Sequence, residues 1–349
     1  MSGTRKFLFR QISTALIIIG FAALCCLFFL QPSYQTDRFA KGDGFFALPL
    51  DAQSGTYYVR GDVGVQSRSV KFLVDTGSDH VWVKDSFVSR PALSGMLSEG
   101  FSIEYVGGRA SGYRLDEQLT IAGTSWNQSI GVVTQTSEHL YGIEGIIGIS
   151  RRCRDSALCV AANWRLRRNV VGFVVTDSRS MTGKMIAGVI DPSHCKQNMT
   201  LTWVSNIGNF FWMTKVGLIL GEDILMSEAR AIWDTGTTRL YFASYIHLKI
   251  LDSLPRDSCK VRTLPDLHVM IGKRSFRIPS TSYARDTGFN TCEWLFGPMD
   301  ERWRTQSGAD MILGWAFLRA HYVVFDSQGD RLGICDIEDS YKPTLRVSR

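Results

Sequence analysis

The stretch Phe72-Leu73-Val74-Asp75-Thr76-Gly77-Ser78 returns later in the chain as Ala231-Ile232-Trp233-Asp234-Thr235-Gly236-Thr237. In each copy an apolar run leads into Asp-Thr-Gly and a hydroxyl residue. Each copy then continues into a second apolar and aromatic cluster, Val81-Trp82-Val83 or Leu240-Tyr241-Phe242. A repeat of this extent predicts one architecture that the chain uses twice.

A single Asp-Thr-Gly usually marks a turn, because Asp accepts bonds from nearby backbone amides and Gly supplies positive φ. The duplicated context favours a different interpretation. A carboxylate at the end of an apolar strand costs free energy to bury unless it is hydrogen-bonded. Two such carboxylates at matching positions indicate that Asp75 and Asp234 are brought together.

On these motifs the chain resembles the pepsin family of aspartic proteases, with Asp75 and Asp234 at the positions of that family's catalytic pair. The resemblance runs from Tyr57 to Cys335. It implies an all-β, bilobal fold with a few short helices. It also implies a monomer that hydrolyses a peptide or protein substrate without a cofactor or a metal. One carboxyl group would take a proton from water while the other gives one to the peptide.

The resemblance gives supporting roles to the residues that follow each Asp. The glycines would let backbone amides approach the carboxylates, and the hydroxyl residues after them would bond the outer carboxylate oxygens. The threonines would lock the two loops together, although ordinary β propensity also accounts for Thr at such positions. These catalytic-loop residues are Thr76, Gly77, Ser78, Thr235, Gly236 and Thr237.

The stretch Phe101 to Gly112 resembles the family's flap, a hairpin that closes over substrate. Tyr105 falls at the flap tyrosine, and Gly107-Gly108 is expected to form the turn. Trp82 matches the aromatic residue that holds this tyrosine through its indole N–H. Plain core packing is the alternative for both aromatic residues. The chain departs from the family at two flap positions, Val106 and Arg109.

Two apolar triplets, Ile146-Ile147-Gly148 and Ile312-Leu313-Gly314, resemble the buried supports behind the active-site loops. Glu144 and Trp315 stand close to them where the family has Asp. We expect both replacements to lie at the periphery of the chemistry.

The chain begins with a basic stretch, 1–11, that is followed by an uncharged apolar run, 12–30. This run approaches the length of about 20 residues that crosses a bilayer, and no small-x-small cleavage site follows it. The pattern predicts a transmembrane signal anchor with a cytosolic N-terminus and a short stalk at 31–43. A removed signal peptide remains the alternative. The rest of the chain would then lie in the secretory-pathway lumen, an acidic vesicle or the cell exterior.

Further features fit an exported protein. Asn127 and Asn198 each begin a glycosylation acceptor triplet. Six cysteines lie outside the apolar run, an even number that is compatible with disulfides in an oxidising compartment. The sequence alone leaves fifteen ways to pair all six cysteines. The family resemblance favours the pair Cys259 with Cys292. Elimination then suggests two more, Cys153 with Cys159 and Cys195 with Cys335.

The body of the chain is predicted to form an N-terminal β lobe, 44–176, and a C-terminal β lobe, 177–340, followed by a tail, 341–349. Short β-branched and aromatic runs broken by Gly, Asp, Asn and Ser predict strands throughout. The best helical candidate is 244–254, with Tyr245, Leu248 and Leu251 or Asp252 near one face.

The formal charge of +6 and the pI near 8.9 allow an anionic partner or a solvated basic face. No nucleic-acid motif accompanies the basic runs at 151–154 and 165–168. The six histidines show no paired metal-ligand spacing. Two other functions compete with protease, a catalytically silent relative that binds peptides or glycoproteins and an unrelated adhesion module. The intact, duplicated Asp-Thr-Gly favours an active enzyme.

Overall fold

The computed structural model describes residues 44–89, 100–152, 164–177, 182–197, 199–255, 260–288 and 291–337, which lie in one compact unit, Phe39–Arg349. Several predictions fall outside the described residues: the anchor at 12–30, the stalk, the glycan site at Asn198, and Cys153, Cys159 and Cys259. Within the described part of the chain, no helix has the length and apolar character needed to cross a bilayer.

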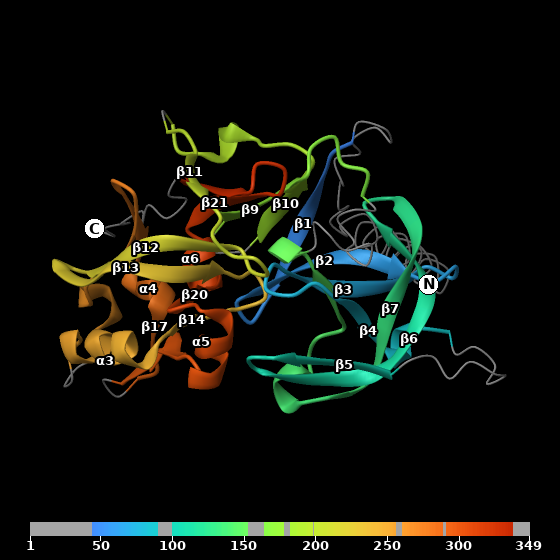
Figure 1. Ribbon diagram of the computed structural model, residues 1–349, viewed down its shortest axis with the longest axis horizontal. Coiled ribbons are helices and arrows are strands. Elements are labelled where there is room, and N and C mark those ends of the chain that lie inside the picture. The colour runs from blue at the N-terminus through green and yellow to red at the C-terminus, as the bar shows by residue number, and fades with distance from the viewer. Residues whose placement is uncertain are drawn as a thin grey trace, which may run out of the picture. The chain divides into compact units, whose positions relative to one another are not determined.

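Most of the described chain forms β-strands in two large sheets (Figure 1). The larger has thirteen strands in the order β11-β22-β21-β9-β10-β1-β2-β3-β8-β4-β7-β6-β5. These strands are β1 Phe46–Gln53, β2 Thr56–Val63, β3 Arg68–Asp75, β4 Val81–Lys84, β5 Gly100–Tyr105, β6 Gly108–Ile121, β7 Thr124–Thr136, β8 Gly145–Gly148, β9 Val170–Asp177, β10 Thr182–Ala187, β11 Thr202–Ser205, β21 His321–Asp326 and β22 Arg331–Asp336.

The smaller sheet has seven strands in the order β16-β15-β12-β13-β20-β14-β19, and β17 pairs with β18 apart from it. These strands are β12 Met213–Leu220, β13 Asp223–Trp233, β14 Leu240–Phe242, β15 Leu267–Ile271, β16 Arg274–Ile278, β17 Ala284–Asp286, β18 Cys292–Trp294, β19 Phe296–Pro298 and β20 Met311–Leu313. In the described part of the chain the α-helices are few and short: α3 Ser244–Ser253, α4 Ser280–Tyr283, α5 Glu301–Ser307 and α6 Trp315–Leu318. The prediction of a mostly-β fold with a few short helices is confirmed.

The sequence repeat is also a repeat of strand pairing. β3 runs parallel to β8, and β4 runs antiparallel to β8. In the other sheet β13 runs parallel to β20, and β14 runs antiparallel to β20. The two apolar triplets supply β8 and β20, whose isoleucines and leucine are at most 2% exposed. Each Asp-Thr-Gly therefore follows a strand that is supported from behind by a buried apolar neighbour.

Strands from both ends of the body meet in one part of the larger sheet. β9 pairs with β10 on one side and with β21 on the other, so a segment near the middle of the chain lies beside one near its end. Figure 1 shows β1, β9, β10 and β21 together, with β12 and β13 on one side and β4 to β7 on the other. The predicted boundary between the lobes falls at the β9–β10 hairpin. The division into two lobes remains a prediction.

The predicted helix at 244–254 is present as α3, but its predicted face is wrong. Ile246 and Ile250 are fully buried, whereas Tyr245 and Leu248 are 43% and 58% exposed. The buried pair is spaced i, i+4 and so lies on one side of the helix. That side contacts β13, β14 and β19.

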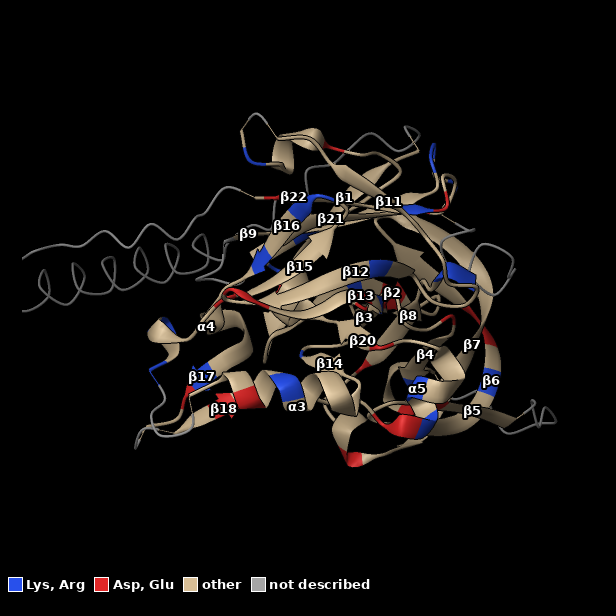
Figure 2. Cartoon of the chain, turned by 60° about the vertical axis from the view of Figure 1, so that its left-hand side comes forward, with Lys and Arg blue, Asp and Glu red and all other residues tan. Residues whose placement is uncertain are grey.

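Cys195 and Cys335 form a disulfide that joins the segment after β10 to β22. Cys292 is also disulfide-bonded, and its predicted partner Cys259 lies outside the described residues. Figure 2 shows acidic and basic residues interspersed along the described part of the chain. Arg151, from one basic run, forms a two-pronged ion pair with Asp330, at 2.5 and 2.9 Å. Part of the basic sequence is therefore neutralised internally.

Candidate active site

Asp75 is the last residue of β3, and its carboxylate is held by the loop that follows. The Gly77 backbone N–H donates to Asp75 Oδ1 at 2.8 Å, and the Ser78 hydroxyl donates to Oδ2 at 2.5 Å. The side chain is only 4% exposed. A buried carboxylate with a donor on each oxygen meets the requirement that buried polar groups be hydrogen-bonded.

Asp234 directly follows β13 and has the same two donors. The Gly236 N–H donates to Asp234 Oδ1 at 2.8 Å, and the Thr237 hydroxyl donates to Oδ2 at 2.5 Å. The matching bonds show that the sequence repeat fixes the orientation of both carboxylates by identical local contacts.

Thr76 and Thr235 lock the two loops to each other. The Thr76 N–H donates to Thr235 Oγ1 at 3.1 Å, and the Thr235 N–H donates to Thr76 Oγ1 at 2.9 Å. Each hydroxyl also donates across to the opposite strand, Thr76 to Trp233 O and Thr235 to Val74 O. Both threonines are fully buried. Loss of one hydroxyl would leave buried partners unsatisfied, at a cost of about 1–3 kcal/mol each.

Each catalytic-loop glycine lies against the carboxylate of the opposite loop: Gly77 against Asp234, and Gly236 against Asp75. A methyl group added at Gly77 would come within 2.8 Å of Asp234 Oδ1, and one added at Gly236 would come within 2.3 Å of Asp75 Oδ1. Real Cβ atoms do not make contacts below 3.0 Å. Glycine is therefore required at both positions, because only its bare backbone lets the opposite carboxylate approach this closely.

Burial raises the pKa of Asp75 well above its ordinary value, and the charge of Asp234 and a hydrogen bond with it raise that pKa further. The bonds from Ser78 and Gly77 lower it by less. Two carboxyl groups in contact resist double ionisation, so the pair can hold one proton between them. The proton belongs to the pair and not to either residue alone.

A buried tryptophan supports the Asp234 loop. Trp315 Nε1 donates to Thr235 O at 2.7 Å, and the Trp315 ring lies 4.2 Å from the Tyr57 ring. The expectation that Trp315 lies at the periphery is therefore wrong. An indole N–H is only a donor, and the loop carbonyl of Thr235 is the acceptor for buried Trp315. Glu144, by contrast, accepts from the Lys71 N–H on β3 at 2.7 Å.

The predicted flap is the antiparallel hairpin of β5 and β6. Tyr105 pairs with Gly108, so the turn consists of Val106 and Gly107 and not of Gly107-Gly108 as predicted. A side chain at Gly108 would collide with Ser137 Oγ, because its Cβ would lie 1.9 Å away. The space around a Cβ at Gly107 is open.

Trp82 and Tyr105 are joined as the resemblance implies. Trp82 Nε1 donates to the Tyr105 hydroxyl at 2.8 Å, and Trp82 is fully buried. Burial and then the Asp75 charge raise the pKa of Tyr105. The influence of Asp75 on this hydroxyl indicates that the flap tyrosine lies close to the carboxylate pair.

The sequence analysis did not single out a third carboxylate, which directly follows the first motif. Asp79 follows Ser78 and lies 2.6 Å from His80 Nδ1. Although burial raises the pKa of Asp79, the hydrogen bond and charge of His80 lower it overall. The adjacent Asp-His dipeptide was the available signal. Within the described ranges, no cluster of three or more His, Cys, Asp or Glu residues is placed to hold a metal ion.

Comparisons with known proteins agree with this geometry. A sequence profile for eukaryotic aspartyl proteases matches residues 56–337. Renin of Rattus norvegicus is 24% identical over 324 residues, covering 81% of this chain and 79% of renin. Polyporopepsin of Irpex lacteus is 25% identical over 329 residues, covering 82% of this chain and 96% of polyporopepsin. A crystal structure of the aspartic proteinase from Irpex lacteus is similar in fold, with a TM-score of 0.71 at 21% identity over 84% of this chain and 98% of that one.

Proposed function

Because the chain belongs to the eukaryotic aspartyl protease family and is an aspartic-type endopeptidase of the pepsin kind, we propose that Asp75 and Asp234 are its catalytic pair. The observation that carries this proposal is the placement of each carboxylate against the other's glycine. Two carboxyl groups in contact, one protonated, form the acid and base that hydrolysis of an amide needs.

The proposed reaction uses water as the nucleophile. The ionised carboxyl group takes a proton from water as the water oxygen attacks the peptide carbonyl carbon, and the protonated carboxyl group gives its proton to the carbonyl oxygen. The tetrahedral diol then collapses. The carboxyl group that took the proton from water gives it to the nitrogen as the C–N bond breaks, and the other carboxyl group takes a proton from a diol hydroxyl as the C=O bond re-forms. This step releases a new carboxyl terminus and a new amino terminus and restores the pair. No covalent bond forms between the enzyme and the substrate.

The surrounding residues keep the pair ready for this chemistry. The Gly77 and Gly236 amides and the Ser78 and Thr237 hydroxyls fix the carboxylate planes before substrate binds. The threonine bonds hold the loops at one separation. Fixed donors need no reorganisation during the reaction, which is how such sites stabilise a transition state.

The hairpin of β5 and β6 is the proposed cover of the peptide substrate. Tyr105 is fixed through Trp82 next to the pair, while Val106 at the tip is 45% exposed and Gly107 has open space around it. A substrate lying between the tip and the pair would meet an aromatic and apolar surface. We therefore expect a preference for long, apolar peptides.

We propose that the enzyme works in the secretory pathway, with residues 12–30 as a type II anchor. The disulfide between Cys195 and Cys335 supports an oxidising compartment. Asn127 is exposed on β7 and accessible to a glycan, which suits the same compartment. The uncharged run after a basic N-terminus supports the anchor and its orientation.

The experiment that tests the function is cleavage of a long apolar peptide at mildly acidic pH by the full chain in neutral detergent. We expect turnover that a statine-type mimic of the tetrahedral diol abolishes. A correctly folded chain that binds the mimic but cleaves no peptide would instead identify a silent peptide-binding relative.

A further inference from the structure

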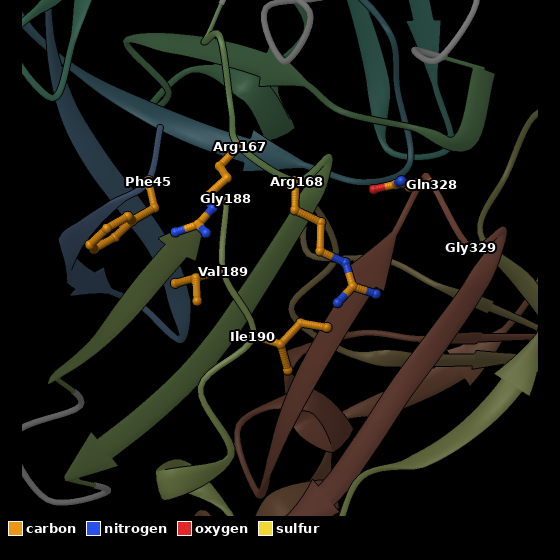
Figure 3. A pocket seen from close by; sticks show the side chains of 8 residues that line it. All are labelled: Phe45, Arg167, Arg168, Gly188, Val189, Ile190, Gln328 and Gly329. Carbon is orange, nitrogen blue, oxygen red and sulfur yellow. The ribbon is translucent and has the colours of Figure 1, made fainter. Parts of the chain in front are cut away.

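A cavity of about 640 Å³ opens on a part of the molecule that contains none of the proposed catalytic residues (Figure 3). It is lined by four separate pieces of chain: Phe45 before β1, Arg167 and Arg168 before β9, Gly188 to Ile190 after β10, and Gln328 with Gly329 in the turn between β21 and β22. Its volume lies within the range of about 300–1,000 Å³ that is usual for small-molecule sites.

Arg168 belongs to a charged group with an excess of positive charge. Asp326, which is fully buried, accepts from Arg168 Nη2 at 2.9 Å and from Arg331 Nε at 3.0 Å on the same oxygen. The Gly329 N–H donates to its other oxygen at 2.9 Å. One carboxylate is thus shared by two guanidinium groups, so Asp326, Arg168 and Arg331 together carry a net charge of about +1.

Arg167 adds a second positive charge. Its side chain is exposed, and within the described ranges it forms no ion pair with a carboxylate. Its backbone N–H is bonded to Gly44 O at 2.6 Å, which fixes the position from which the side chain extends. Among the described residues that line the cavity there is no Asp or Glu, and the nearby Asp330 is already paired with Arg151.

The rest of the lining is partly apolar. Val189 is 38% exposed, and Phe45 and Ile190 are half-buried. Figure 3 shows that the side chains of Arg167 and Arg168 diverge: Arg167 extends on the side of Phe45 and Val189, and Arg168 on the side of Ile190. The cavity is also much larger than a bare oxyanion. Its natural ligand should therefore carry both an anionic group and an apolar or neutral body.

We propose that this cavity binds a phosphate group on a larger molecule, with the Arg167 guanidinium group as its direct partner and the net positive charge of Arg168, Arg331 and Asp326 beside it. A phosphate monoester approaches two negative charges near neutral pH, which matches the two uncompensated positive charges. The planar guanidinium fork binds phosphate oxygens in pairs. The phosphate could come from a phospholipid headgroup or from a soluble phosphorylated compound. The site is independent of the proposed peptidase chemistry.

The first test is calorimetric titration of the full chain in neutral detergent with glycerol 3-phosphate and with inorganic phosphate. We expect saturable binding that weakens about tenfold or more in Arg167→Gln, as for loss of one charge-assisted contact. Arg165→Gln is the matched control, since Arg165 is exposed on the same segment but does not line the cavity. Absence of binding, unchanged binding in Arg167→Gln, or equal weakening in Arg165→Gln would overturn the proposal.

The second test separates the two sources of phosphate. The chain is placed in phosphatidylcholine nanodiscs with or without phosphatidic acid and titrated with glycerol 3-phosphate. If phosphatidic acid weakens the binding of glycerol 3-phosphate to the parent but has no such effect on Arg167→Gln, the site is assigned to a lipid headgroup. If the affinity of the parent for glycerol 3-phosphate is the same with and without phosphatidic acid, the site is assigned to a soluble compound. Repeating the titration on Asp75→Asn should give the same affinity, so failure of this site and failure of the peptidase proposal are distinguishable.

Discussion

At the scale of single residues, the site depends on two glycines that have no side chain and on a buried Asp75 whose pKa is raised. Gly77 and Gly236 leave room for the opposite carboxylates, and burial keeps Asp75 from ionising at its ordinary pH. The same arrangement that suits the chemistry should therefore cost stability whenever the pH forces both carboxyl groups to ionise.

Asp75→Asn is expected to change how stability depends on pH. The folded-state pKa of Asp75 is raised above its unfolded value, so its stabilising contribution is complete below about pH 4 and is lost as the pH rises through the folded-state pKa. Asn cannot ionise. The melting temperature of the variant should therefore exceed that of the parent increasingly from pH 4 towards neutrality. Asp223→Asn, at an exposed position, is the control, and a constant difference across this range would contradict the raised pKa.

Trp315→Phe tests whether the indole positions the Asp234 loop. Phe keeps the packing on Tyr57 but leaves Thr235 O without its donor, at a cost of about 1–3 kcal/mol. We expect kcat to fall about tenfold with little change in KM, because the loop is displaced and the flap is not. Trp126→Phe loses an indole bond to Gln128 on β7 instead. If that control reduced kcat equally, the effect would be one of general stability.

At the scale of elements, much could be predicted from the sequence, and the errors have identifiable causes. The strands that carry the repeat follow from their apolar runs, as does the flap from its Gly-rich turn. The predicted face of α3 is wrong because Tyr245 and Leu248 recur at a helical spacing just as Ile246 and Ile250 do, and only contact with β13, β14 and β19 distinguishes the two faces. The flap turn was displaced by one residue because cross-strand register is fixed by pairing and not by glycine content.

Tyr105→Phe tests whether the hydrogen bond between Trp82 and Tyr105 helps the β5–β6 hairpin to bind substrate. This change removes the hydrogen bond from Trp82 Nε1 but keeps the aromatic ring. We expect kcat/KM to fall about tenfold, mainly through KM, since a net hydrogen bond contributes about 1 kcal/mol and a looser flap binds peptide less well. Tyr113→Phe, in the same hairpin, should leave the kinetics unchanged. Equal kinetics for Tyr105→Phe and the parent would show that the bond has no part in substrate binding.

At the scale of the whole molecule, most contacts between segments far apart in the chain could not be predicted from the sequence. The approach of the two Asp residues was foreseen because the motif repeats. The contact of Trp315 with the Thr235 loop, and the pairing of β9 with β21, join segments with no shared pattern. The Cys195–Cys335 disulfide, which elimination among the possible pairings suggested, is confirmed by the fold.

The orientation of the whole chain is tested in intact vesicles. If residues 12–30 anchor it with the N-terminus in the cytosol, protease added outside the vesicles should leave the body undigested until detergent is added. Asn127→Gln should reduce the mass of the body by one glycan. Digestion of the body without detergent would contradict the proposed orientation.

The most direct measurement is turnover of one long apolar peptide by the parent, Asp75→Asn, Asp234→Asn and the double variant, with a thermal melt of each. The account predicts that each single variant stays folded and loses at least about 10²- to 10⁴-fold in rate. The double variant should lose scarcely more, because the pair acts as a unit. Near-normal turnover by either folded single variant would contradict the assignment of Asp75 and Asp234 as the catalytic pair.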